Sequence, residues 1–175
     1  WVGIPFASVL FGDVFAAISP WRAVGRAVGW GAERISGGLP SPIEYPERLG
    51  RWPAAIGLLL FAWVELVWTG RESPESLAIV ALTYAVVMLV GMSCFGVEKW
   101  VRNADAFGVA FGLFALLSPF EWSGRRCRLC WPVVGTLRMP ELSGAAAVVV
   151  VLIGSTTFDG FSQGGVWTGA SGLAQ

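Results

Sequence analysis

The sequence predicts an all-α integral membrane protein, a polytopic bundle of transmembrane helices that forms a single domain. Hydrophobic residues make up 55% of its 175 residues, charged residues make up only 14%, and the mean hydropathy is +0.64. Such a chain is far more apolar than an average soluble domain. The apolar residues form long runs, and the charged residues cluster between them. The net charge is zero, so the basic surface that nucleic-acid binding requires is missing, and the expected partner is the lipid bilayer.

The first apolar run, residues 1–19, predicts span 1. A Pro and a Gly interrupt this run, and a Ser-Pro pair ends it. It lacks a basic start and a small-residue cleavage site followed by polar sequence, which favours a retained membrane segment over a signal peptide. Residues 21–35 place their apolar side chains on one helical face, which predicts a short amphipathic helix. This helix either lies in the membrane interface or packs on protein as a connector.

Four more spans are predicted after a loop rich in Pro and Gly at residues 37–53. Span 2 covers residues 52–69 and has Trp side chains available as interfacial anchors. Span 3 covers residues 77–97 without a charge, and span 4 covers only residues 106–117. A basic loop then leads to span 5, residues 142–158. The sequence therefore predicts about five spans.

The ends of the chain suggest a larger protein. It begins at Trp1 rather than Met and stops at Gln175 in a Gly-rich stretch. We expect a piece of a longer chain whose further spans pack against this one. The sequence also leaves open a homo-oligomer.

A motif recurs within the chain. Residues 15–21 (FAAISPW) resemble residues 114–120 (FALLSPF), and each copy is followed by an Arg-bearing connector and an apolar span that ends in an acid. Span 1 then corresponds to span 4 and span 2 to span 5, and a period of three crossings inverts the second copy. The recurring motif predicts an inverted repeat. The alternative is a chance similarity, because Phe, Ala and Leu are common in membrane helices. In carriers, broken spans at corresponding positions of two repeats mark the binding site.

Four acidic side chains lie in or at the edges of the apolar runs: Asp13, Glu65, Asp105 and Asp159. A carboxylate in hydrocarbon costs roughly 2.5 to 3.5 kcal/mol on insertion scales, so each needs a partner, a water-filled cavity or a proton. Asp13 is the strongest candidate for a proton or cation site. The alternative is a hydrogen bond to a neighbouring span or to backbone exposed at the helix break. In the aligned copies, Asp105 lies about two helical turns from the position of Asp13, which predicts that the two acids share a face.

Glu65 and Asp159 lie near predicted helix exits, where the helix dipole disfavours an anion. Each therefore needs a partner or contact with water. The candidate charge partners are Arg22, Arg51 and Arg138.

Familiar catalytic chemistry is scarce in this chain. It has no His, which excludes Ser-His-Asp triads and His-ligated zinc or haem within it. Cys127 and Cys130 form a C-x-x-C pair, but a tetrahedral zinc site needs four ligands and this pair supplies two. Nearby Arg residues favour thiolates, so the pair is a weak candidate for metal or redox chemistry. No cofactor is predicted, and no catalytic residue is assigned.

Four runs resemble a known family: residues 11–23 (FGDVF through SPWRA), 45–53 (YPERLGRWP), 105–108 (DAFG) and 156–161 (TTFDGF). The sequence resembles multi-span actinobacterial membrane proteins that are often labelled fenitrothion hydrolase. The resemblance implies a bacterial plasma membrane protein, and the label implies hydrolysis of an organophosphate ester. It carries no catalytic residues over to this chain.

Three functions stay open on this basis. The first is a carrier or permease-like protein in which Asp13, together with Asp105, binds a proton or cation near the broken helices. The second is a membrane-embedded hydrolase, in which carboxylates hold a metal or Asp13 and Asp159 share a proton. The third is a structural membrane subunit. A polar cavity beside Asp13 favours the first, clustered carboxylates favour the second, and carboxylates sealed against Arg favour the third.

Overall fold

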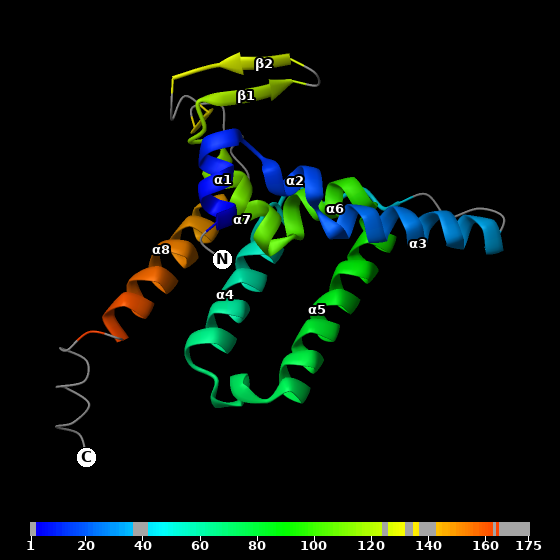
Figure 1. Cartoon of the computed structure of the whole chain (residues 1–175). Coiled ribbons are helices and arrows are strands. Elements are labelled where there is room, and N and C mark those ends of the chain that lie inside the picture. The colour runs from blue at the N-terminus through cyan, green and yellow to red at the C-terminus, as the bar shows by residue number, and fades with distance from the viewer. Residues whose placement is uncertain are drawn as a thin grey trace.

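The chain is mainly helical, which confirms the all-α class predicted from composition (Figure 1). One antiparallel hairpin, β1 (Phe120–Ser123) with β2 (Arg126–Leu129), stands where a basic loop was expected between spans 4 and 5. The computed structural model describes residues 3–36, 42–123, 126–131, 135–136, 143–162 and 164. Its helices are α1 (Gly3–Phe11), α2 (Val14–Ile18), α3 (Pro20–Ser36), α4 (Trp52–Leu66), the 3-10 turn η1 (Thr69–Glu72), α5 (Pro74–Phe95), α6 (Val97–Ala104), α7 (Ala106–Ala115) and α8 (Ala145–Ser162).

Two helices in the described part of the chain, α5 and α8, are long and apolar enough to cross a membrane. The helices Gly3–Phe11 and Val14–Ile35, bent by 111° at their junction, add a third if they are counted as one broken span. The apolar helices α4 and α7 have only 15 and 10 residues, whereas a crossing needs about 20. The described residues thus provide two or three helices of spanning length, where the sequence predicted about five spans.

The ends of α5 follow from local capping chemistry. Ser73 Oγ accepts a hydrogen bond from the Ser76 N–H at 3.5 Å, and Pro74 occupies the first helical position. Gly96 ends the helix with a φ of +84°, a conformation that a side chain would disfavour. The helix therefore starts three residues before the predicted span 77–97 and stops two residues before its end.

The other predicted ranges also differ from the helices at their ends. The amphipathic range 21–35 lies within α3, residues 52–69 contain α4, and residues 106–117 contain α7. The range 142–158 overlaps α8, although residue 142 lies outside the described part. Gly144, with a φ of +80°, precedes the first turn of α8.

The first apolar run breaks into two helices at Gly12. This glycine has a φ of +90°, and its N–H still donates to the Ser8 carbonyl at 3.0 Å as α1 ends. Asp13 then caps α2, because its Oδ1 accepts a hydrogen bond from the Ala16 N–H at 3.0 Å. The predicted span 1, residues 1–19, is therefore a short helix, a sharp turn and a second short helix.

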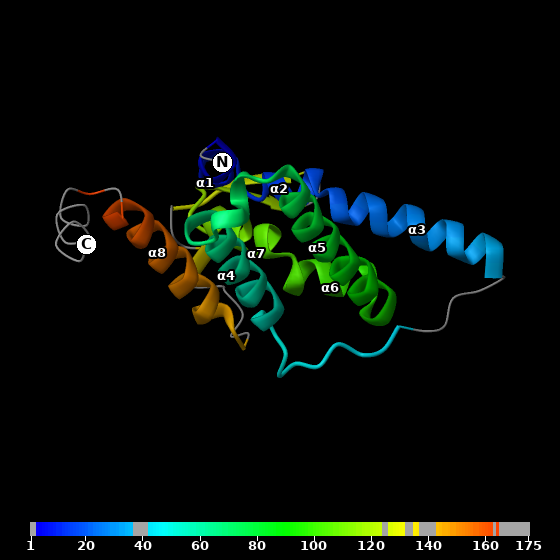
Figure 2. The ribbon, with the colours of Figure 1, turned by 90° about the horizontal axis from the view of Figure 1, so that it is seen from below.

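Three helices have roughly parallel axes. The helices α4 and α5 form an antiparallel hairpin, and α8 begins beside the start of α4 and runs in the same direction in both views (Figures 1 and 2). The helices α3 and α6 lie across the end at which α5 stops and α4 begins (Figure 1), and α3 projects sideways beyond the bundle (Figure 2). The arrangement therefore resembles a bundle with a transverse layer at one end.

Small and apolar side chains form two cores. The first joins α4, α7 and α8 through Ala54, Ala55, Leu58, Ala106, Val109, Ala110 and Val148. The second joins α5 and α6 through Met88, Met92, Trp100, Val101 and Ala104. Most other large apolar side chains of α4, α5 and α8 point outward and are exposed, as expected for helices that face lipid.

The segments that correspond in the recurring motif lie next to each other. Ser118, just after α7, donates its hydroxyl to the Leu10 carbonyl near the end of α1 at 3.5 Å. At the starts of α4 and α8, the Arg51 N–H donates to the Ser143 carbonyl at 2.6 Å, and Trp52 Nε1 donates to Ser143 Oγ at 3.1 Å. The helices α4 and α8 therefore run in one direction from adjacent starts (Figures 1 and 2), whereas an inverted repeat places corresponding helices antiparallel.

Candidate functional site

The residues singled out from the sequence fall into two groups. Asp13, Arg22 and Asp105 lie where α2 and α3 meet α6 and α7. Glu65 lies in the last turn of α4 and Asp159 near the end of α8, at the ends that point away from this junction (Figure 1). The structure therefore gathers three of the candidates into one site and leaves the other two acids apart from it.

Asp105 is the buried centre of the junction. It stands at the N-cap position of α7 with no exposed surface. The Tyr84 hydroxyl, which α5 supplies, donates to Asp105 Oδ1 at 3.1 Å and accepts a hydrogen bond from the Ala106 N–H at 3.2 Å. Trp21 of α3 packs its ring edgewise on the Tyr84 ring, with centroids 5.6 Å apart. Three helices thus fix one oxygen of this carboxyl group.

The second oxygen of Asp105 is less well satisfied. Oδ2 is buried and has no hydrogen-bond partner within the described residues. The N–H groups of Phe107 and Gly108 point toward the carboxyl group, but neither reaches Oδ2 with hydrogen-bonding geometry. A Cβ atom added at Gly108 would lie 2.7 Å from Oδ2, so only glycine leaves room for this oxygen. A buried polar atom without a partner is a costly arrangement that calls for an explanation.

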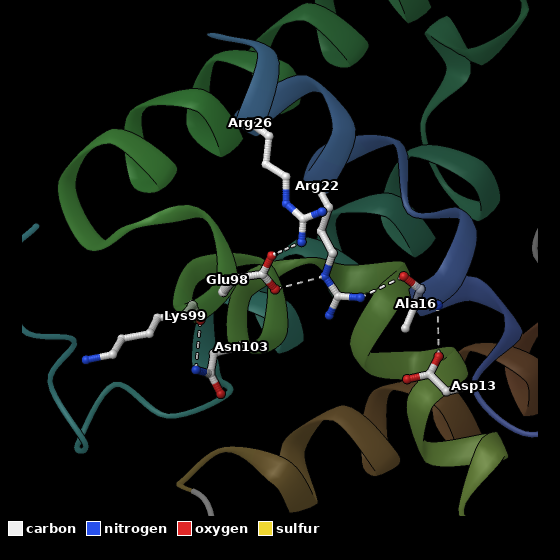
Figure 3. Close-up of polar contacts among 7 residues, drawn as sticks. All are labelled: Asp13, Ala16, Arg22, Arg26, Glu98, Lys99 and Asn103. Carbon is white, nitrogen blue, oxygen red and sulfur yellow. Dashed lines mark hydrogen bonds and ion pairs between the residues drawn. The ribbon is translucent and has the colours of Figure 1, made fainter. Parts of the chain in front are cut away.

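Arg22 of α3 lies beside this centre and makes two polar contacts. Its NH1 donates to the Ala16 carbonyl at 2.6 Å, and its Nε lies 3.3 Å from Glu98 Oε2 (Figure 3). Burial raises the pKa of Asp105 above its ordinary value; hydrogen-bond donors around the carboxyl group oppose this, and the positive charge of Arg22 opposes it least. Arg22 therefore connects the α2 backbone to α6.

Glu98 of α6 binds two arginines of α3. Besides Arg22, it accepts a hydrogen bond from Arg26 NH2 at 2.6 Å (Figure 3). The hydrogen bond from Arg26 holds the pKa of Glu98 below its ordinary value; burial opposes this, and the neighbouring positive charges reinforce it. The Glu98 side chain keeps 58% of its surface exposed, so this ion pair is hydrated. Glu98 thus links the buried junction to solvent.

A polar cavity of about 380 Å³ adjoins Glu98 between α6 and the loop before α4. Its wall includes five charged side chains and one amide, and consists of Glu44, Tyr45, Glu47, Gly50, Glu98, Lys99, Arg102 and Asn103. Asn103 is held by a hydrogen bond from its Nδ2 to the Lys99 carbonyl at 2.9 Å (Figure 3). Because Glu98 contacts both this cavity and Arg22, polar groups extend from the surface toward Asp105.

Asp13 differs from Asp105 because its side chain is exposed. Its Oδ1 caps α2 at the Ala16 N–H, which is the hydrogen bond to exposed backbone weighed above as the alternative to an ion site. Its Oδ2 faces α7, where a Cβ added at Gly112 would lie 4.0 Å away. Asp13 and Arg22 therefore bind opposite ends of the same peptide residue, Ala16 (Figure 3).

Two of the three candidate charge partners, Arg22 and Arg51, lie within the described residues. Arg22 pairs with Glu98. Arg51 lies at the start of α4, about 20 Å of helix away from Glu65, and next to the start of α8 rather than to Asp159. Burial lowers the pKa of the Arg51 guanidinium, and its Nε has no hydrogen-bond partner in the described structure.

The remaining candidates are only partly described. Arg138 and the side chain of Cys127 lie outside the described residues. Cys130 follows β2, and its N–H donates to the Pro119 carbonyl at 2.8 Å. Among the described side chains, no group of three or more Cys, Asp or Glu lies close enough together to hold a metal ion.

Two residues of the site were missed in the sequence, Tyr84 and Glu98. Tyr84 is one of only two tyrosines in the chain and lies inside an otherwise apolar run, where a buried hydroxyl usually finds a partner. The sequence therefore contained a signal that could have identified Tyr84. Glu98 gave no comparable signal, because its partners are more than 70 residues away and come from the packing of α3 on α6.

Comparison with known proteins adds no assignment. No family model matches the chain, and neither curated proteins nor solved structures match it.

Proposed function

We propose that this protein is a membrane carrier in which the Asp105 carboxyl group takes up and releases a proton or a cation. The proposal depends on one observation: Asp105 is fully buried at a helix break, with Oδ1 bound by Tyr84 and Oδ2 lacking a hydrogen bond within the described residues. A buried carboxyl group in this state is stable when it carries a proton or when a cation replaces its lost hydration. Reversible loading of such a group is the basic event of ion-coupled transport.

We propose that the ion approaches Asp105 from the side of Glu98. Glu98 faces the polar cavity and binds Arg22, whose charge acts on Asp105. An ion that enters the cavity meets Glu98 first and the buried acid second. Arg22 then stabilises Asp105 after the proton or cation leaves.

Asp13 takes a supporting role in this proposal. It lies at the break between α1 and α2, and its Oδ2 faces α7, the helix that Asp105 begins. Broken helices that meet in this way expose backbone groups within a membrane protein, as in the binding sites of carriers.

The membrane placement follows the helix axes. We propose that the shared axis of α4, α5 and α8 is the membrane normal and that α3 lies in the interface (Figures 1 and 2). The polytopic bundle then has about five crossings or partial crossings, of which α1, α4 and α7 are short. We propose the bacterial plasma membrane as its location.

The test is ion uptake by proteoliposomes that contain the wild type, Asp105→Asn or Glu75→Gln. Asn preserves the shape of Asp105 but binds no proton, whereas Glu75 is an exposed acid in the first turn of α5, outside the site. Under an imposed membrane potential, an internal pH dye reports protons and radioactive sodium reports cations. We expect Asp105→Asn to reduce uptake at least tenfold and Glu75→Gln to leave it unchanged. Equal uptake by the wild type and Asp105→Asn would refute the proposal, and wild-type uptake at the level of empty vesicles would favour a structural subunit.

Two substitutions at Asp13 separate its charge from its capping bond. Asn caps helices about as well as Asp, so Asp13→Asn removes only the charge, whereas Asp13→Ala also removes the cap at a cost of about 0.5 to 2 kcal/mol. We expect Asp13→Asn to retain most of the uptake and Asp13→Ala to lower the stability. Loss of uptake in Asp13→Asn would make Asp13 a second ion site.

Hydrolysis is the second candidate function, because the runs that resemble the fenitrothion hydrolase family contribute residues to this site. Residues 11–23 supply Asp13 and Arg22, and residues 105–108 supply Asp105 and Gly108. The same purified samples are therefore assayed for turnover of a phosphotriester. Turnover that Asp105→Asn abolishes, without ion uptake by the wild type, would replace the carrier proposal with this one.

A further inference from the structure

A groove of about 560 Å³ separates α3 from the end of α5. Its wall is mainly apolar and consists of Gly25, Arg26, Val28, Gly29, Trp30, Ala32 and Glu33 on one side and Pro42, Leu89, Met92, Ser93, Gly96 and Val97 on the other. The volume lies within the range of small-molecule sites. The ion site proposed above does not use this groove.

Two glycines on α3 produce the groove. A Cβ added at Gly25 would lie 2.6 Å from Met92 Sδ and 2.9 Å from Val97 Cγ1, so α3 touches its neighbours closely there. One helical turn later, a Cβ added at Gly29 would meet nothing within 4 Å. The helix therefore diverges from α5 after Gly25, and Gly29 faces open space within the groove.

The groove continues the outward face of α5. Leu82, Val86 and Val90 follow one another at intervals of four residues and are 66%, 57% and 57% exposed. The next position on this face, Ser93, lies in the wall of the groove, and its hydroxyl is already bonded to the Leu89 carbonyl at 2.9 Å. Since α5 has the length and hydropathy of a membrane-crossing helix, lipid chains along this face reach the groove directly.

The far rim of the groove suits a lipid headgroup. Trp30 is 64% exposed, and the Arg34 guanidinium lies over its ring at 5.2 Å from the centroid. Trp favours the membrane interface, and a guanidinium binds phosphate oxygens. Glu33 places one negative charge in the wall, whereas Arg26 is held by Glu98. Arg34 is therefore the cation positioned to meet a phosphate.

We propose that this groove holds one acyl chain of a bilayer phospholipid, whose phosphate lies at Arg34. The acyl chain covers the apolar wall of the groove without a second protein, so this wall no longer meets water. The proposal requires that α5 crosses the membrane and that α3 lies in the interface, as proposed above, and it does not depend on the ion site.

The test is photocrosslinking in lipid nanodiscs with a phosphatidylglycerol that carries a diazirine on one acyl chain. Labelled peptides are quantified by mass spectrometry in the wild type, Gly29→Phe and Gly31→Phe. Phe at position 29 fills the groove, whereas Gly31 also has open space around it but does not line the groove, so it is the matched control. We expect wild-type labelling on the groove walls, a loss of at least fivefold in Gly29→Phe and no change in Gly31→Phe.

An Arg34→Gln variant tests the headgroup contact. We expect it to weaken labelling by the anionic lipid about threefold while labelling by a neutral diacylglycerol analogue stays constant. Far-ultraviolet circular dichroism and a monodisperse elution profile show that each variant folds. Groove labelling no higher than on the outward face of α8, or equal labelling in Gly29→Phe and Gly31→Phe, would overturn the proposal.

Discussion

Replacing Tyr84 with Phe removes one oxygen atom from the centre of the site and leaves the ring in place. That oxygen makes two hydrogen bonds, one to Asp105 Oδ1 at 3.1 Å and one from the Ala106 N–H at 3.2 Å. The edgewise contact between the rings of Tyr84 and Trp21 is kept in the variant. The change therefore isolates the hydrogen bonds from the packing of α3 on α5.

The expected loss of stability follows from the burial of both partners. Asp105 has no exposed surface and Ala106 is 1% exposed, so water does not replace the lost hydroxyl. Leaving a buried donor or acceptor without a partner costs about 1 to 3 kcal/mol each. Because both belong to one network, their contributions do not simply add. We expect Tyr84→Phe to lower the free energy of unfolding by about 2 to 4 kcal/mol.

The second tyrosine provides a matched control. Tyr45 donates one hydrogen bond, to the Gly50 carbonyl at 2.7 Å, so Tyr45→Phe should cost only about 1 kcal/mol. Both variants are unfolded by titration with a denaturing detergent in mixed micelles and followed by circular dichroism. A loss in Tyr84→Phe no larger than in Tyr45→Phe would show that the hydroxyl of Tyr84 does not stabilise the junction, and would remove the support for a fixed Asp105 carboxyl group.

Two further predictions concern packing and pH. A Cβ at Gly91 would overlap the Trp100 ring, so Gly91→Ala should lower the free energy of unfolding by about 1 to 3 kcal/mol through overpacking. This loss is expected despite a gain of up to about 1 kcal/mol in helix propensity. Net stabilisation in the same titration would contradict the observed packing. The hydrogen bond from Arg26 lowers the pKa of Glu98, so ionised Glu98 stabilises the folded protein. This stabilisation is full above the ordinary Glu pKa of about 4.3 and is lost as the pH falls through the lowered value. Glu98→Gln should therefore flatten the acidic limb of the stability profile by less than about 1 kcal/mol, with a smaller effect in high salt, and an unchanged limb would contradict this ion pair.

Helix ends were predictable where local chemistry decides them. Ser73, Pro74 and Gly96 bracket α5, and each is a recognised capping residue that the sequence displays. Hydropathy alone places the ends less well, because an apolar side chain is as acceptable just after a membrane helix as within it. The predicted span 52–69 accordingly extends beyond Leu66, where α4 ends.

The acidic residues of the site could be predicted from the sequence, but the residues that pair with them could not. Asp13 and Asp105 stand out because a carboxylate among apolar residues is rare, and both lie at the junction. The pairing of Arg22 with Glu98 depends on how α3 packs across α6, and nothing near either residue in the sequence encodes that contact. A lone charge is visible in a sequence, but its partner is a property of the tertiary structure.

The parallel direction of α4 and α8 has a structural reason. The sequence counted three crossings between the copies, because it took residues 1–19 as one complete span, and an odd count inverts the second copy. In the structure this run turns at Gly12, and the helices on either side of the turn are bent by 111°, so it does not form one straight span. The direction of α8 relative to α4 is set by the elements between them: α5 runs antiparallel to α4, and α7, with only 10 residues, is too short to return the chain to the far end of the bundle. The helix α8 therefore starts again beside the start of α4 and runs parallel to it (Figures 1 and 2).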